Sequence, residues 1–428
     1  MKLRPAGRLY VLGAILLVAL TICSRKFSSI GEPSFIIPLA VAGIAYLLAI
    51  RELFATPKFP QRVIVVGLVL AALWRIPFLL SPPRPDDDIH RYLWDGRIQR
   101  LGYNPYMVVP SDPALRGLHT SETRTLNNPD LPSPYPPGAQ MFFRAITAIH
   151  ESLFSLKVAF VLCDLAIVLV LLEILRTSGQ GAHWILAYAW HPLLVTDVAG
   201  SGHIDIVGAL LLVVSVAALR HRWRAVAAVA FALAVAVKFL PIVLLPLYWK
   251  RIRIRDGLLA AAVVGLLYVP FLNRGRIPFG SLGTYVRSFR FNDPVFAALE
   301  RVTAPLFAVG LALVAGFLAA IWLRSRAPSS PDAFAWPMAA SLLCAPVVYP
   351  WYLLWLLPFM RSPSTVPIII WTVSIIPTYY VWHLRTLDRP WLVPGWIMVL
   401  EYGSVALATA IVEFRRLRRP AAPRSSTE

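Results

Sequence analysis

The stretch PDDDIHRYLWDGRIQRLGYNPY, residues 85–106, places three consecutive aspartates where the chain leaves an apolar run. From Asp88 to Leu101 the pattern predicts a short amphipathic helix, because carboxylates suit a helix N-terminus. We expect Gly102 to end this helix. One cap needs one side chain, and three adjacent carboxylates repel one another, which raises the pKa of at least one of them. A carboxylate of this kind suits a general base, so we favour function over a simple cap.

The composition around this stretch is that of a polytopic membrane protein. Of 428 residues, 58% are hydrophobic and 15% are charged, and the mean hydropathy is +0.65. Soluble domains average about 45–50% apolar and about 25% charged residues. Charge-free runs recur along the chain, and several approach the ~20 residues that cross a bilayer. We therefore predict an all-α integral membrane protein with about 11–13 transmembrane helices, the first of them retained and not removed as a signal peptide.

The net charge is +19, and the basic residues that produce it are placed as in a membrane protein. Basic clusters at 220–224, 250–255 and 415–419 each lie at the end of an apolar run, which is typical of positive-inside anchoring. This placement argues against a nucleic-acid partner. The three cysteines lie far apart in apolar runs, and their spacing indicates neither a metal site nor redox work.

The basic residues also predict which loops face outside. Lys2, Arg4, Arg8 and the basic segment 51–62 indicate a cytoplasmic N-terminus, so the helix at 63–81 exits. The predicted organisation is one transmembrane domain, 1–428, with an extracytoplasmic catalytic loop at 82–156, a second external loop at 273–301 and a cytoplasmic basic tail at 415–428. The predicted location is a bacterial-type cytoplasmic membrane, with the active site on the extracytoplasmic side.

Two apolar segments are too short for two crossings although both of their flanks are basic. For 225–249, we predict a broken helical hairpin with Lys238 near its tip, because Pro241 interrupts the helix. The segment 333–360 contains Pro346 and Pro350 and suggests a second broken hairpin. Such non-helical backbone is tolerated where it lines a cavity. A single crossing that violates the charge bias remains the alternative for each.

The string DDDIHRYLWDGRIQRLGYNPY, followed by SPYPPGAQ, resembles the GT-C glycosyltransferases. Within them it is most similar to family 87 and related polyprenol-phosphomannose-dependent mannosyltransferases. Weaker matches occur at 235–246, 287–296 and 349–359. Members often have His before Pro-Trp-Tyr, where this chain has Tyr349, so no role of that His carries over. The matching positions of the acidic motif are Asp88, Ile89, Tyr92, Gly102, Pro105 and Tyr106.

The resemblance implies a GT-C-like helix bundle and a polyprenyl-phosphate-linked sugar donor, with no metal or other cofactor. The predicted reaction is an inverting transfer of a sugar, mannose by resemblance, to an extracytoplasmic glycan or glycolipid. Asp88 is the predicted base, Asp87 is second, and Asp86 is interpreted as a cap. The predicted substrate-binding residues are Arg91, Tyr92, Asp95, Asn104, Tyr106, Tyr135, His203, Asp205, Lys238, Arg276, Arg287 and Arg290.

Several of these side chains have a purely structural alternative. Lys238 lies inside an apolar run, which favours function over snorkelling. With Arg276, Arg287 and Arg290, it is predicted to stabilise the departing phosphate. The pair formed by Arg91 and Asp95 at i, i+4 either stiffens the site or is a solvated ion pair. His203 and Asp205 contact substrate or form a satisfied pair inside the bundle, and Tyr135 faces the site or merely shapes a bend.

Two other classes of protein share some of these features. A secondary transporter or lipid flippase also uses broken helices and intramembrane charges, but it predicts inverted repeats, and the two halves show no clear repeat. A lipid-glycan ligase shares the substrate type but usually carries its main loop later in the chain. We therefore favour the glycosyltransferase, with a lipid-linked glycan transporter or flippase as the alternative.

Overall fold

The computed structural model describes residues 3–84, 86–326, 328 and 330–418, and this part of the chain is helical with two isolated β-bridges and no strand. Lys2, Pro85 and the predicted tail from residue 419 onward lie outside the described residues. The α-helices are α1 (Pro5–Arg25), α2 (Pro33–Ala55), α3 (Gln61–Leu80), α4 (Asp88–Arg100), α5 (Pro137–Ile149), α6 (Leu153–Thr177), α7 (Ile185–Ala189), α8 (Asp205–Arg220), α9 (Arg224–Val237), α10 (Leu245–Tyr248), α11 (Ile254–Tyr268), α12 (Leu282–Ser288), α13 (Pro294–Glu300), α14 (Pro305–Leu323), α15 (Asp332–Leu343), α16 (Val366–Ser374), α17 (Tyr380–Thr386) and α18 (Gly395–Leu417).

Ten short helical turns connect them within the described residues. They are η1 (Phe27–Ser29), η2 (Pro113–Leu118), η3 (Ala182–Trp184), the π-helical η4 (Leu194–Gly200), η5 (Leu240–Leu244), η6 (Val269–Phe271), η7 (Pro350–Trp355), η8 (Leu357–Phe359), η9 (Pro363–Thr365) and η10 (Ile376–Tyr379).

Eight helical stretches in the described residues are long and apolar enough to cross a membrane, which confirms a polytopic membrane protein. A ninth results if η4 and α8, bent by 115° relative to each other, are counted as one span. This is fewer than the about 11–13 transmembrane helices that we predicted. The difference arises because several apolar runs are broken into short helices at prolines and polar residues. The eight are Pro5–Arg25, Pro33–Ala55, Gln61–Leu80, Leu153–Thr177, Ile254–Phe271, Pro305–Leu323, Pro363–Thr386 and Gly395–Leu417.

The first predicted hairpin is broken at the expected residue. Helix α9 ends before Lys238, whose backbone is extended, and Pro241 lies in the first turn of η5. Arg220, before the hairpin, and Arg251, after it, each donate a hydrogen bond to a backbone carbonyl of the segment 324–328. Both ends of the hairpin therefore lie at the same end of the bundle, which supports the hairpin over a single crossing.

The second predicted hairpin shows the same geometry. Ser364 Oγ donates to Asp332 Oδ2 at 3.3 Å, so the chain returns close to the start of α15. Between these ends the helix stops at Leu343, and η7 follows. At the far end, Val348 N donates to the Phe291 carbonyl at 2.9 Å. The tip of this hairpin is thereby attached to the predicted external loop 273–301.

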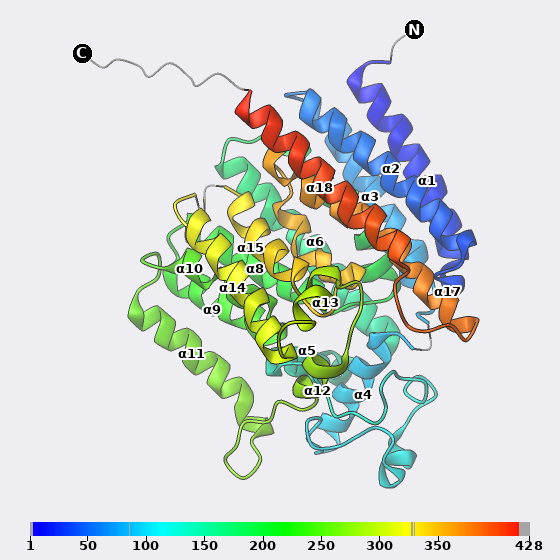
Figure 1. Ribbon diagram of the computed structural model, residues 1–428, viewed down its shortest axis with the longest axis vertical. Helices are drawn as coiled ribbons and strands as arrows, with labels where there is room; N and C mark the ends of the chain where they lie inside the picture. The colour runs from blue at the N-terminus through cyan, green and yellow to red at the C-terminus, as the bar shows by residue number, and fades with distance from the viewer. Residues whose placement is uncertain (1–2, 85, 327, 329, 419–428) are drawn as a thin grey trace.

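The arrangement places α4, α5 and α12 together at the bottom of Figure 1, away from the two chain termini at the top. Helices α4 and α5 pack closely because Gly96 has no side chain. A Cβ there would lie 2.6 Å from the Phe143 carbonyl oxygen. One continuous apolar core runs through the bundle. A small second cluster, formed around Trp94 and Leu115, fixes the loop after α4.

Candidate functional site

The three aspartates at the start of α4 have different partners. Helix α4 begins at Asp88, as predicted, and no side chain caps it. Asp87 Oδ1 accepts a hydrogen bond from Arg84 Nη2 at 2.9 Å. Asp86 forms ion pairs with Arg84 at 3.3 Å and with Arg385 at 3.2 Å. The interpretation of Asp86 as a helix cap is therefore wrong, because its carboxylate instead links the segment before α4 to helix α17.

One carboxylate oxygen of Asp88 accepts no hydrogen bond from the described part of the protein. Asn127 Nδ2 donates to its Oδ1 at 2.6 Å, while Oδ2 lies 3.8 Å from His203 Nδ1, beyond hydrogen-bond distance. Its side chain is 22% exposed. Burial raises the pKa of the Asp88 carboxyl, with smaller contributions from Asp87 and Asp205; the Asn127 hydrogen bond and the Lys238 charge oppose it. A carboxylate that is accessible and made more basic by its surroundings can accept a proton from a bound hydroxyl.

Lys238 lies near enough to Asp88 for its charge to act on that carboxyl, and it is held by Asp205, the first residue of α8. Its Nζ is 2.7 Å from Asp205 Oδ1, and Trp355 Nε1 donates to the same oxygen at 2.7 Å. The ammonium also lies over the Tyr352 ring, 3.7 Å from its centroid. These contacts direct Lys238 into the protein and not toward the lipid, so snorkelling does not describe it. The tip of the first hairpin presents a fixed positive charge to the site.

His203 occupies the bend between η4 and α8. Its ring stacks on Trp351 with 4.0 Å between centroids and 9° between planes. His203 Nδ1 is buried and has no hydrogen-bond partner within the described part of the chain. His203 faces Asp88 while Asp205 binds Lys238, so the alternative of an inert pair between His203 and Asp205 is not what the structure shows.

Arg91 and Asp95 form a buried ion pair that holds the loop after α4. Their ion pair, 2.9 Å between Nε and Oδ1, is almost completely buried. Gln140 Nε2 donates to Asp95 Oδ2 at 2.8 Å, and Arg91 Nη1 donates to the Leu131 carbonyl at 2.9 Å. The alternative of a solvated pair is wrong. Their hydrogen bonds hold the segment after α4 in place, which gives both residues a structural role, and direct substrate contact by them stays a prediction.

Tyr92 and Tyr135 form an aromatic support beneath Asp88. Tyr92 is 1% exposed and packs edge-to-face against Tyr135, with 5.1 Å between ring centroids, and stacks on Phe143 at 4.5 Å. At this burial, Tyr92 orients its neighbours and has little surface left for substrate. The expectation that Tyr92 binds substrate directly is therefore corrected to a supporting position.

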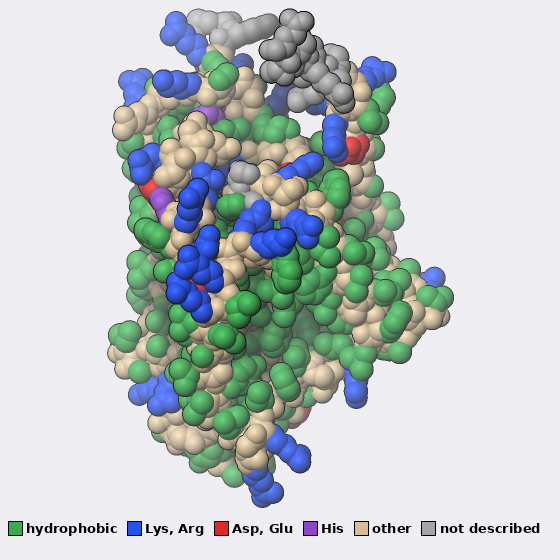
Figure 2. Space-filling model, turned by 90° about the vertical axis from the view of Figure 1, so that its left-hand side faces the viewer, with side chains coloured by type: hydrophobic (Ala, Val, Ile, Leu, Met, Phe, Trp, Pro, Cys, Tyr) green, Lys and Arg blue, Asp and Glu red, His purple; other side chains and the backbone are tan. Residues whose placement is uncertain are grey.

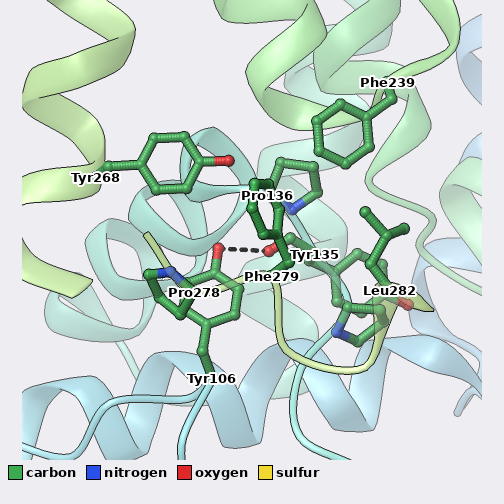
Figure 3. A pocket seen from close by; sticks show the side chains of 9 residues that line it. Tyr106, Tyr135, Pro136, Phe239, Tyr268, Pro278, Phe279 and Leu282 are labelled. Atoms are coloured by element: carbon green, nitrogen blue, oxygen red, sulfur yellow. Dashed lines mark hydrogen bonds between the residues drawn. The ribbon is translucent and has the colours of Figure 1, made fainter. Parts of the chain in front are cut away.

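An apolar pocket is lined by Phe239, the residue that follows Lys238. Figure 3 shows the side chains of Tyr106, Tyr268 and Phe239 converging on it from three separate elements. Tyr106 Oη donates to the Tyr135 carbonyl at 2.7 Å, and Asn104 Nδ2 donates to the Phe271 carbonyl at 2.8 Å, so both residues shape the pocket wall. The pocket is lined by Tyr106, Pro134, Tyr135, Pro136, Phe239, Tyr268, Pro278, Phe279 and Leu282.

The three predicted loop arginines do not reach Asp88. Arg290 forms an ion pair with Glu300, and its guanidinium lies over the Phe296 ring. Arg276 and Arg287 are exposed. These contacts do not support the prediction that the three arginines stabilise the departing phosphate, which stays a prediction, because Arg290 is engaged by Glu300 and the other two side chains face away from the interior.

The sequence analysis missed several residues around Asp88. Arg84, which contacts Asp87 and lies 5.0 Å from the Trp382 ring centroid, supplies the second cation near the site. Its position just before the aspartates is the signal that was available. Tyr285 and Tyr352 join their hydroxyls across two loops. Nothing in the sequence pattern pointed to Asn127 or Tyr285. Among the described residues, no group of three or more His, Cys, Asp or Glu side chains is arranged to hold a metal ion.

Comparison with known proteins identifies the family of this chain. Residues 12–251 match the model of the family described as alpha-(1->6)-mannopyranosyltransferase, N-terminal domain. The chain belongs to this family. Asp88, His203, Asp205 and Lys238 all lie within the matched region, whereas Tyr352 lies beyond it. The predicted relation to mannosyltransferases is thereby confirmed.

Curated relatives extend the match along part of the chain. Alpha-(1->6)-mannopyranosyltransferase A of Mycobacterium tuberculosis is 25% identical over 330 residues, which cover 66% of this chain and 62% of that protein. A second Mycobacterium tuberculosis protein, alpha-(1->6)-mannopyranosyltransferase Rv1459c, is 35% identical over 103 residues, 23% of this chain and 16% of that protein. The chain thus spans less than two thirds of the length of these relatives.

A solved structure is similar at lower identity. The crystal structure of ArnT from Cupriavidus metallidurans bound to undecaprenyl phosphate gives a TM-score of 0.47 at 15% identity, covering 85% of this chain and 79% of that one. At this level the likeness supports no argument about function.

Proposed function

We propose that this protein is an inverting glycosyltransferase that moves mannose from a polyprenyl-phosphate-linked donor to a hydroxyl of a glycan or glycolipid. The observation that carries the proposal is the placement of Asp88 and Lys238 in one site, close enough for the Lys238 charge to act on the Asp88 carboxyl. Asp88 has an oxygen that accepts no hydrogen bond from the described residues, and the ammonium of Lys238 is held in place by Asp205. Membership of the mannopyranosyltransferase family supports the choice of sugar.

The reaction needs a base on the acceptor side. As the acceptor oxygen bonds to the anomeric carbon, the bond from that carbon to the phosphate oxygen breaks, and the acceptor proton passes to Asp88 Oδ2. Direct attack inverts the anomeric carbon without a covalent enzyme intermediate. The burial that raises the pKa of Asp88 also makes its ionised form a stronger base.

The departing polyprenyl phosphate needs cations on the donor side. Lys238 can stabilise the developing charge, since Asp205 and the Tyr352 ring already fix its ammonium. Arg84, beside Asp87, is the second candidate. A phosphate is a good leaving group once its charge is stabilised, so this arrangement needs no general acid.

The apolar wall around Phe239, the residue that follows Lys238, is a candidate contact surface for the lipid part of the donor. Its aromatic and proline side chains would lie against the part of the lipid nearest the phosphate. On the face where α11 lies, hydrophobic side chains dominate the lower part of the surface, which is hollowed (Figure 2). We therefore infer that the polyprenyl chain enters from this lipid-facing side.

An extracytoplasmic site is part of the same proposal. The two predicted external loops, 82–156 and 273–301, meet the bend at 200–205, Lys238 and the segment 347–352 around Asp88. The basic ends of both hairpins gather at the other end of the bundle. This separation supports an active site on the outer side of a cytoplasmic membrane.

The decisive test measures sugar transfer by purified protein in nanodiscs, with labelled polyprenyl-phosphomannose and an α-mannoside acceptor. We expect Asp88→Asn to lower the turnover by ~10²–10⁴-fold, the usual contribution of a general base. Asp87→Asn is the matched control, because Asp87 is already paired with Arg84. Full turnover by Asp88→Asn would refute its role as base. Movement of the donor across a bilayer without transfer by the wild type would favour the flippase.

A further inference from the structure

Two arginines meet at the end of the bundle opposite Asp88. Arg220 is the last residue of α8, and Arg361 follows η8 at the end of the second hairpin. Arg220 Nε and both Nε and Nη1 of Arg361 are buried and make no hydrogen bond. Burial, and then the neighbouring charge of Arg220, lowers the pKa of Arg361 to about 10. The fold therefore brings two cations together and leaves part of each guanidinium without a partner.

The nearby carboxylates are engaged by other groups. Asp332 pairs with Arg326 at 3.6 Å and accepts hydrogen bonds from two serines. Glu173 pairs with Arg176 at 2.9 Å and with His221 at 3.6 Å. Across the described ranges of the chain, no carboxylate forms an ion pair with Arg220 or Arg361. The protein itself thus does not neutralise this pair.

Such an arrangement is costly unless an anion completes it. Leaving a buried donor unsatisfied costs about 1–3 kcal/mol, and an unpaired buried charge costs more. A guanidinium presents several N–H groups in one plane, a geometry that matches the oxygens of a phosphate. Basic pockets between helices on the cytoplasmic side are suited to anionic headgroups. Figure 2 shows Lys and Arg side chains gathered over the upper part of the face where α10 and α11 lie.

We propose that Arg220 and Arg361 form a binding site for a phosphate group. The phosphate belongs either to the headgroup of an anionic phospholipid or to a free phosphate ion. Helix α8 carries Asp205 at its other end, about 24 Å away at 1.5 Å per residue. The second hairpin carries Tyr352 near its tip. A phosphate bound between Arg220 and Arg361 would therefore link the ends of α8 and of the second hairpin that lie farthest from the candidate site. The proposal does not depend on the reaction that this site performs.

The test compares ligands in nanodiscs of phosphatidylcholine. Three samples contain phosphatidylcholine alone, added phosphatidylglycerol, or added inorganic phosphate, and the thermal unfolding midpoint is measured in each. Wild type is expected to be stabilised by phosphatidylglycerol, and native mass spectrometry should show the lipid retained. Arg361→Gln should weaken that retention by at least about tenfold, which corresponds to losing one hydrogen bond to a charged group. Arg220→Gln should have the same effect.

The control variant is Arg224→Gln, an exposed arginine four residues after Arg220. It should keep the full response to phosphatidylglycerol. In phosphatidylcholine alone, Arg361→Gln should be at least as stable as wild type, because it removes one of two adjacent buried cations. An equal response to inorganic phosphate identifies the free ion as a ligand. The proposal is overturned if neither ligand stabilises wild type, or if both stabilise Arg361→Gln and Arg220→Gln as much as wild type.

Discussion

Asp88 and Asp95 lie two turns apart on α4 and have opposite surroundings. Asp95 is fully buried, and its two oxygens accept hydrogen bonds from Arg91, Ser133 and Gln140. Asp88 is partly exposed, and its Oδ2 has a histidine at 3.8 Å as its nearest ion-pair partner. Both oxygens of Asp95 therefore accept hydrogen bonds from the protein, whereas one oxygen of Asp88 is free to accept a hydrogen bond from a ligand.

The difference separates structural from chemical roles among residues that look equivalent in the sequence. A buried carboxylate whose two oxygens both accept hydrogen bonds from the protein, as in Asp95, fixes the backbone and has no oxygen left for a substrate. A carboxylate with a raised pKa and an open oxygen can exchange a proton. Four experiments test this contrast, beginning with the one that should give the largest effect.

The largest effect is expected from Asp88→Asn, and it should fall on catalysis alone. The new amide oxygen can still accept the hydrogen bond from Asn127, so the fold should be retained. We expect the turnover number to fall by ~10²–10⁴-fold while the thermal unfolding midpoint stays unchanged. Steady-state transfer assays and thermal unfolding in nanodiscs measure the two quantities. An unfolded Asp88→Asn protein would contradict the contrast with Asp95.

Asp95→Ala should show the reverse pattern. It leaves Arg91 as a buried, unpaired cation, so we expect a loss of about 3–5 kcal/mol in the free energy of unfolding. Denaturant titration in detergent measures this loss. The double variant Arg91→Met with Asp95→Leu is the control, because removing both charges should recover much of the stability. A stable Asp95→Ala protein with impaired donor binding would instead restore Asp95 to the substrate-binding set.

A smaller effect is expected when the cation of the site, Lys238, is removed. Lys238→Ala should raise the KM for the polyprenyl-phosphate donor by ~10–100-fold, since a hydrogen bond to a charged group contributes about 1.5–3 kcal/mol. Arg287→Ala is the matched control, because Arg287 is exposed and should leave the KM near its wild-type value. If Arg287→Ala has the larger effect, the loop 273–301 closes over the donor and our placement of the cations is incomplete.

The smallest effect concerns pH. Because Asp88 must be ionised to act as a base, kcat/KM should fall as the pH drops through its raised pKa. The charge of Asp87 contributes to raising that pKa, so Asp87→Asn should move the acidic limb of the profile to lower pH. A pH profile of kcat/KM for both proteins measures the shift. Movement of the limb to higher pH would show that Asp88 does not interact with Asp87 in this way.

Much of the site could be predicted from the sequence because its signals are local. The aspartates, the glycine and the spacing between them give the bounds of α4 within one residue. Pro241 gives the break beside Lys238, since a missing N–H ends a helix regardless of its neighbours. The charge of Lys238 inside an apolar run is enough to predict a site residue, because an isolated charge at that depth is costly.

The choice of partners could not be predicted in the same way. Arg84 and Arg290 are both arginines near predicted external loops, yet one contacts Asp87 and the other pairs with Glu300. The two alternatives for Arg91 and Asp95 differ only in burial, which depends on how the segment at 128–140 packs over α4. Side-chain pairing between residues far apart in the chain leaves no periodic signal in the sequence.

The sequence by itself determined that this is an all-helical membrane protein, where its helices break, and which acidic motif heads its first large loop. These properties follow from hydropathy, proline and helix-end chemistry, which act over a few residues. Only the tertiary structure decided which of the aspartates of α4 stays open, and which cation stands beside it. Those outcomes depend on the burial and hydrogen bonding produced when loops distant in the chain come together around Asp88.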